Sequence, residues 1–210
     1  SGGGYPTEWA DDEISDVADS ARPSVRGELH SIAARTLMKV LWAARASRYD
    51  LLRQVGHLSC YVSKWTSRQD KALHRLVGYI KGSKSLRLVN WCGDPLDAVR
   101  PHLFADADLG GCVDTQRSTS GLHFVLRGPH TSFVIAGQSK RQPCVSHSTP
   151  EAEMYATAFA LRNEGLPSTL IWDKLFPGFA SICFHEDNQP MIRVLETGKN
   201  PTMRYLHRTH

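Results

Sequence analysis

Carboxylates gather in three short, well-separated segments of this sequence, and they are the side chains whose types and spacing best suit chemistry. Each segment falls at an expected edge of a secondary-structure element, so three different elements would deliver acidic groups. Carboxylate oxygens are the ligands that hard cations such as Mg²⁺ prefer, and two such ions can clamp the attacking and leaving oxygens of a phosphodiester. The alternative is that these acids only cap or end helices and strands. The segments are 106–108, 151–153 and 186–187.

The bulk composition excludes several classes of protein. The 210 residues suit one large domain or two small ones, and 41% hydrophobic content can supply a core. A net charge of +4 is compatible with a polyanionic partner without requiring one. The five cysteines stand singly, which argues against a zinc ribbon or disulfide framework and favours a reducing intracellular compartment, cytoplasmic or nuclear. No apolar run approaches about 20 residues, so we expect no membrane span.

The first half of the chain has a helical pattern. Residues 1–26 lack periodicity and are expected to form a flexible tail. From 27 to 82, apolar residues recur at steps of three and four and predict three helices with Trp42 and Trp65 in their core, the second helix capped by Asp50. A strand is expected at 86–91. Turn residues follow at 92–95, and the period then changes from helical to extended, so we place a domain boundary near residue 95.

The second half predicts an antiparallel meander of strands at 100–108, 121–127 and 132–138, followed by a polar loop from 139. A helix then begins with a capping box of Ser148 and Glu151, which leaves Glu153 without a structural task. We expect this helix to end at 165–167 and another to occupy 168–176. A strand at 180–187 places Glu186 and Asp187 on opposite faces by alternation, and a helix follows at 189–197.

The ordered motifs resemble the ribonuclease H domain of copia-type (pseudoviral) LTR-retrotransposon polyproteins. Further matches fall at 200–201 and 208–210. Residues 74–82 are similar to the thumb and connection region that precedes ribonuclease H in such reverse transcriptases. The resemblance covers roughly residues 28–210. The motifs that carry it are 106–108, 117–121, 139–142, 148–156 and 187–189.

The resemblance implies an α/β, ribonuclease H-like mixed sheet at 96–210, preceded by a helical thumb or connection region at 27–95. It implies that Asp106, Glu153 and Asp187 are catalytic carboxylates that hold two Mg²⁺ ions, with Mn²⁺ as a substitute. Asp106 would bridge both ions, Glu153 would hold the ion on the leaving-group side, and Asp187 would help hold the ion that activates water. Asp108 would support these ligands without binding metal, and Glu186 would point away.

The implied activity is that of a hydrolase, an endonuclease that cuts the RNA strand of RNA–DNA hybrids. Lys140 and Arg141, expected on the loop before the catalytic helix, would contact phosphate; the alternative is ordinary solvation of a loop. The polymerase part of the same polyprotein, or a larger assembly, is the further partner implied.

Two departures from the family's pattern bear on whether the chain is an enzyme. The family's fourth carboxylate, last strand and last helix would lie beyond His210, so the domain is expected to be C-terminally truncated. Pro150 also adds one residue to the usual motif while leaving Glu153 in register. The alternative function is therefore a non-catalytic retrotransposon-derived remnant that serves as a structural subunit or binding partner.

Overall fold

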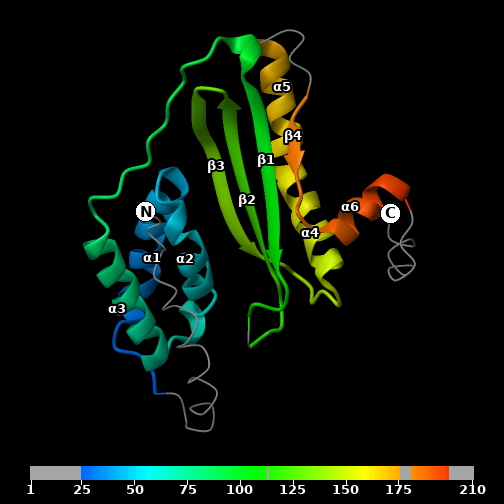
Figure 1. Cartoon of the computed structure of the whole chain (residues 1–210). Coiled ribbons are helices and arrows are strands. Elements are labelled where there is room, and N and C mark those ends of the chain that lie inside the picture. The colour runs from blue at the N-terminus through cyan, green and yellow to red at the C-terminus, as the bar shows by residue number, and fades with distance from the viewer. Residues whose placement is uncertain (1–24, 113, 176–180, 199–210) are drawn as a thin grey trace, which may run out of the picture.

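The computed structural model describes residues 25–112, 114–175 and 181–198, which form a mixed α/β structure (Figure 1). Helices α1 to α3 come first, and a four-stranded sheet with helices α4 to α6 follows. Within these ranges, no helix is both long and apolar enough to cross a membrane. Most of the expected tail, residues 1–24, and the family-like segment at 199–210 lie outside the described residues.

The three predicted N-terminal helices are confirmed, and their apolar stripes form a shared core. Short 3₁₀ turns η3 (Tyr49–Leu51) and η4 (Val62–Lys64) link them. The helices are α1 (His30–Ala46), α2 (Leu52–Ser59) and α3 (Ser67–Gly82). Fully or nearly fully buried residues at helical spacing include Ala33, Leu37, Val55, Leu58 and Leu73.

Two expectations for this region are wrong. Trp42 is 77% exposed, because it lies off the stripe that Leu37 and Ala44 define, whereas Trp65 is buried and donates its indole N–H to Asp70 at 2.7 Å. Asp50 does not cap α2, because its carboxylate pairs with Arg48 at 2.7 Å. This ion pair lowers the pKa of the Asp50 carboxyl below its ordinary value.

The connection between helices and sheet does not contain the predicted strand at 86–91. Only Trp91 pairs there, through an isolated bridge to Ser132. The side chain of Asn90 accepts a hydrogen bond from the Val134 backbone N–H at 3.0 Å, so side-chain bonding replaces a regular ladder. A 3₁₀ turn, η5 (Leu96–Ala98), then leads into the sheet.

The sheet has the strand order β3-β2-β1-β4. Strand β1 pairs antiparallel with β2 and parallel with β4, and β2 pairs antiparallel with β3, so the predicted meander is confirmed. The largest differences from prediction are that β3 extends into the expected polar loop as far as Arg141, and that β4 is much shorter than expected. The strands are β1 (Arg100–Asp108), β2 (Thr119–Gly128), β3 (Thr131–Arg141) and β4 (Cys183–His185).

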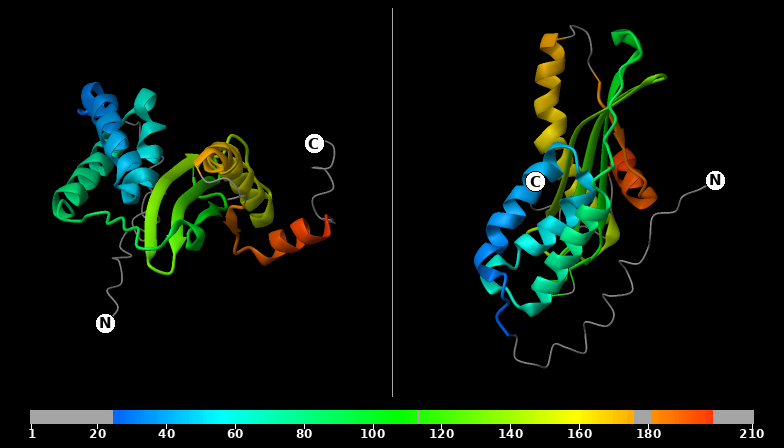
Figure 2. Two further views of the ribbon diagram at one scale, coloured as in Figure 1. Left: turned by 90° about the horizontal axis from the view of Figure 1, so that it is seen from above. Right: turned by 90° about the vertical axis from the view of Figure 1, so that its left-hand side faces the viewer.

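Helices α4 and α5 cover one face of this sheet. Helices α1–α3 lie beside β3, on the side of the sheet away from α4 and α5 (Figures 1 and 2). The predicted break at 165–167 is wrong, because a π-helical segment, η6, carries the chain from α4 into α5. Helix α6 has the predicted bounds. The elements are α4 (Thr149–Ala160), η6 (Leu161–Gly165), α5 (Leu166–Leu175) and α6 (Gln189–Thr197).

Small residues allow α4 to approach the sheet closely. Ala152, Ala156 and Ala160 are fully buried and share one apolar cluster with Leu103 and Ala105 of β1. At the helix start, the Ser148 hydroxyl accepts from the Glu151 backbone N–H at 3.4 Å. The Glu151 carboxylate reaches back one residue further than a capping box requires, to the backbone N–H of His147 at 2.8 Å.

Buried Gln142 fastens the start of α4 to the sheet. Its side-chain amide donates to the Ser120 hydroxyl at 3.0 Å and to the Ala152 carbonyl at 2.9 Å. Its side-chain oxygen accepts from the Ser146 hydroxyl at 2.9 Å. Because Ala152 directly precedes Glu153, this anchor fixes where Glu153 enters the helix.

We expect Gln142→Leu to lower the free energy of unfolding by about 3 kcal/mol, because three buried polar partners lose their hydrogen bonds. The melting temperature should fall by roughly 8 °C in a circular-dichroism melt at pH 7. Gln189→Leu, at an exposed position, is the control and should change stability by less than about 0.5 kcal/mol. A Gln142→Leu protein that melts with the wild type would show that the anchor is dispensable.

Candidate metal centre

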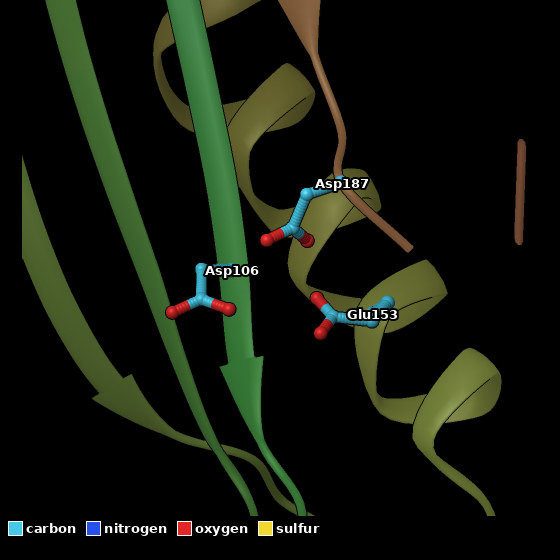
Figure 3. A group of neighbouring side chains, drawn as sticks. All are labelled: Asp106, Glu153 and Asp187. Carbon is cyan, nitrogen blue, oxygen red and sulfur yellow. The ribbon is translucent and has the colours of Figure 1, made fainter. Parts of the chain in front are cut away.

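Three carboxylates from three different elements converge at one end of the β1–β4 pair. Asp106 comes from β1, Glu153 from the first turns of α4, and Asp187 from the segment between β4 and α6. One carboxylate oxygen from each residue lies within 4.8 Å of the others. Figure 3 shows the three side chains pointing toward a common space between the strand and the helix.

Sheet register explains why Asp106 and Asp187 meet. Strands β1 and β4 run parallel, with Phe104 paired to His185, so both aspartates follow two residues after the same rung. Carboxyl ends of parallel strands lie at the same edge of a sheet, where ligands commonly bind. Because β4 ends at His185, Glu153 reaches this edge from the helical layer without a strand in its way.

Glu153 has the most perturbed environment of the three. Its side chain is 4% exposed, and among the described residues its Oε2 has no hydrogen-bond partner. Burial raises the pKa of Glu153 to about 7, and repulsion from Glu186, Asp106 and Asp187 adds to the shift. A hydrogen bond from the backbone of Ala107 opposes it. Burial and the neighbouring negative charges therefore disfavour the ionised form of Glu153.

This donor set fits a hard divalent cation. All three groups offer carboxylate oxygens, the ligand type of Mg²⁺ and Mn²⁺. Asp106 and Asp187 are exposed, so an ion can enter, while no partner within the described ranges competes for the buried Oε2 of Glu153. A bound cation would also offset the repulsion that raises the pKa of Glu153.

Asp108 lies outside the carboxylate group, whereas the expectation that Glu186 points away is wrong. The Asp108 carboxylate accepts from the Thr119 backbone N–H and pairs with Arg53 of α2 at 3.1 Å, so it fastens the helices to the sheet. Glu186 does not point away. It accepts from the Thr157 hydroxyl of α4 at 3.2 Å, on the same helix as Glu153.

Lys140 and Arg141 lie on the last two positions of β3 and not on a loop. Lys140 is exposed, with its ammonium 5.9 Å from the centre of the Phe159 ring of α4. Arg141 is half-buried. Burial raises the pKa of the Cys112 thiol, but hydrogen bonds with Thr115 and the charge of Arg141 bring it below its ordinary value.

Beside the aspartates lies a ring cluster that the sequence pattern did not single out. His185 stacks on Phe104 and contacts His102, both from β1. Alternation puts residues 102, 104 and 106 on one face of β1, but only the pairing register of β4 shows which of its residues face them.

Gln142 is a second functional residue that sequence reasoning did not single out. It stands out in the sequence only as part of a motif, because nothing in its local sequence shows which partners its side chain will bind.

Comparison with known proteins links the chain to retrotransposons. It is 29% identical over 137 residues to the retrovirus-related Pol polyprotein from transposon TNT 1-94 of Nicotiana tabacum, covering 65% of this chain and 9% of that polyprotein. An uncharacterized mitochondrial protein of Arabidopsis thaliana is 29% identical over 124 residues, covering 59% of this chain and 49% of that protein. No family model and no solved structure matches the chain.

A third relative is the secreted RxLR effector protein 161 of Plasmopara viticola, 31% identical over 121 residues, which are 58% of this chain and 80% of that protein. The class is thus one of transposon-derived polyprotein segments, and the matches support a copia-type retroelement origin. The chain belongs to the family that includes the Plasmopara protein. It spans less than a tenth of the tobacco polyprotein and about half of the Arabidopsis protein.

The raised pKa of Glu153 predicts a pH-dependent gain in stability for Glu153→Gln in EDTA. The carboxyl titrates near 4.5 when unfolded and near 7 when folded, so its contribution to stability is present below pH 4.5 and is lost as the pH rises through 7. Removing the charge should therefore stabilise the protein by about 2 kcal/mol more at pH 8 than at pH 5.5.

Melting temperatures at the two pH values measure this difference, which should be roughly 5 °C. Glu151→Gln is the matched control, since Glu151 lies on the same helix but outside the carboxylate group. An equal effect of Glu153→Gln at both pH values would contradict the electrostatic origin of the strain.

Proposed function

We propose that the chain is the ribonuclease H-like part of a copia-type reverse transcriptase and hydrolyses the RNA strand of RNA–DNA hybrids with divalent metal. The observation that carries this proposal is the convergence of Asp106, Glu153 and Asp187 within 4.8 Å. Their order and their sequence motifs are those of the family that the chain resembles.

The arrangement of the sheet supports the proposal. A ribonuclease H-like fold is expected to open with three antiparallel strands, followed by a helix and a strand parallel to the first. Here β1, β2 and β3 form that meander, α4 crosses one face, and β4 returns beside β1 in the order β3-β2-β1-β4. The acids lie where β1, α4 and the end of β4 meet.

Asp106, Glu153 and Asp187 would hold the metal ions in this proposal. When bound, two such ions activate water and stabilise the leaving oxygen of a phosphodiester. The chain's own contribution is to gather anionic oxygens at one point and to bury Glu153, whose Oε2 accepts no hydrogen bond from the described residues. Thr157 and the Asn188 backbone N–H engage Glu186, which keeps that acid hydrogen-bonded beside the site.

The chemistry of the site and the resemblance to ribonuclease H domains support the proposed substrate class. A scaffold that cuts hybrids reads duplex shape and 2′-hydroxyls more than base sequence. Lys140 and Arg141, at the end of β3, provide cations for the phosphate backbone. The polymerase part of a longer polyprotein is the proposed covalent partner, because the Pol relative extends far beyond the matched segment.

Replacing Asp106 by Asn tests the catalytic claim. We expect the wild type to cleave a labelled RNA–DNA hybrid in Mg²⁺ or Mn²⁺ and the variant to lose about 100-fold or more in rate, since a metal ligand matters more than the surrounding groups. Glu151→Gln should keep the wild-type rate. Cleavage that is equal in the wild type and Asp106→Asn, or absent from both, would contradict the proposal.

Replacing Lys140 and Arg141 by Ala tests the binding of substrate phosphate separately. Each cation that binds phosphate contributes about 1 to the slope of log affinity against log salt, so the double variant should lose about 2, and binding should weaken without regard to sequence. Fluorescence anisotropy with a labelled hybrid in Ca²⁺ measures this. Arg193→Ala, an exposed cation on α6, is the control, and an unchanged slope in the double variant would show that the pair does not touch phosphate.

A non-catalytic role as a structural subunit is the second candidate, and one feature favours it. A cavity of about 410 Å³ opens between the sheet and α5, lined by apolar side chains such as Phe124, Leu126 and Ile171. Exposed Leu166 and Leu170 lie on the same helix. A folded wild type that binds no Mn²⁺ and cuts no hybrid would favour this role over catalysis.

A further inference from the structure

We propose that His185, held by His102 and Phe104, is a positioning residue that sets Asp187 against Asp106. The inference rests on the metal centre of the proposed function and adds residues that the carboxylate motifs do not include. It concerns the shortest strand of the sheet, β4, because Asp187 depends on that strand for its place.

The pairing of β4 is too short to hold Asp187 directly. The ladder with β1 contains three pairs, His102 with Cys183, Leu103 with Phe184, and Phe104 with His185, and it stops there. Asp106 still belongs to β1 and pairs with Gly121 of β2, whereas Asp187 lies outside every strand. The last rung, at His185, is therefore the closest point at which the sheet can control Asp187.

Side chains make this last rung stronger than a backbone pair alone. The rings of His185 and Phe104 lie parallel within 8°, with centroids 4.2 Å apart, so they stack face to face. The His185 Nε2 and His102 Nδ1 atoms are 2.7 Å apart, and one of them donates its proton to the other. These two imidazoles are inclined by 16° with centroids 5.0 Å apart, so they meet edge to edge.

The two contacts restrain different motions. The hydrogen bond to His102 opposes sliding of β4 along β1. The stack on Phe104 opposes rotation that would tilt the His185 ring out of its plane. On the opposite face, Phe184 packs against the apolar cluster of α4 and Glu186 bonds to Thr157. Asp187 thus follows a short segment that is anchored on both faces of the sheet.

Beyond Asp187 the chain is fixed again. The Asn188 side chain accepts from the Met191 backbone N–H at 3.0 Å and caps α6, and Met191 is fully buried. Asp187 is left between two anchored neighbours with its carboxylate exposed and aimed at the common space in Figure 3. Groups that orient metal ligands in this way commonly change metal affinity by about 10- to 100-fold when they are removed.

The experiment measures Mn²⁺ affinity of the full chain by electron paramagnetic resonance, a readout that does not depend on cleavage. We expect His185→Ala to weaken binding about 10-fold or more and His102→Ala, which leaves His185 in place, to weaken it several-fold, roughly 5-fold. His185→Phe keeps the stack and removes the hydrogen bond, so its affinity should fall between wild type and His185→Ala. The double variant His102→Ala/His185→Ala should be no weaker than His185→Ala, because both changes remove the same hydrogen bond.

His123→Ala is the matched control. His123 pairs with Phe104 in the neighbouring strand β2 and its ring lies 6.2 Å from that of Phe104, but it belongs to the side of β1 away from β4. Its Mn²⁺ affinity should stay within about twofold of wild type. Thermal melts establish that each variant is folded, and His185→Phe and His102→Ala decide the question if His185→Ala does not fold.

Three results would overturn the inference. A folded His185→Ala protein with wild-type affinity would show that β4 needs no such anchor. Equally weakened binding in His185→Ala and His185→Phe, with His102→Ala unchanged, would make His185 a direct ligand. Equally weakened binding in His123→Ala would assign the effect to the sheet face as a whole.

Failure of the proposed function has a different signature. If the wild type binds Mn²⁺, Asp106→Asn does not, and the wild type still cuts no hybrid, the ribonuclease activity is wrong while the graded effects at His185 and His102 still support the positioning role. A wild type that binds no Mn²⁺ would overturn both.

Discussion

Repulsion between carboxylates is the constraint that the rest of this structure works against. Glu153 is buried beside Asp106, Asp187 and Glu186, and its pKa is raised to about 7 by that burial and by those charges. Apolar contacts and hydrogen bonds around the cluster offset this repulsion. Apolar contacts of Ala152 and Ala156 press α4 onto β1, and the hydrogen bonds of Gln142 fix the helix start. A cation bound at this cluster, as proposed above, would offset that repulsion.

The end of β1 joins the candidate metal centre to the N-terminal helices. Asp106 faces the centre, while Asp108, two residues later, pairs with Arg53 of α2. Tyr61, in the turn after α2, donates a hydrogen bond to Asp114 in the connection from β1 to β2, and this bond, after burial, raises the pKa of the tyrosine. The end of β1 and the middle of the connection each contact the helical part, so a movement of α2 would be transmitted to the strand that carries Asp106.

Local patterns predicted most elements, because periodicity and caps are properties of neighbouring residues. The three N-terminal helices, β1 and α6 follow from such signals. The triad follows from motifs, but its convergence depends on the β1–β4 register, which no local signal specifies. The lack of a local signal for tertiary contacts also explains the wrong expectations. Strand alternation correctly places Glu186 on the face opposite Asp187, but helix α4 covers that face, so Glu186 contacts Thr157 and does not point away. Continuation of β3 through Arg141 depends on pairing with Thr119 of β2.

The π-helical segment between α4 and α5 sets the rotational phase of everything after it. A regular helix turns by about 100° per residue, so the extra residue in a π turn rotates the following helix by that amount. Here the phase directs Ser168 inward and leaves Leu166 and Leu170 outward. Glu164, within the segment, accepts from the Gln138 side chain at 2.6 Å and marks where the shift is accommodated. Deleting one residue there would turn α5 about its axis more than it would shorten it, and a different set of side chains would meet the sheet.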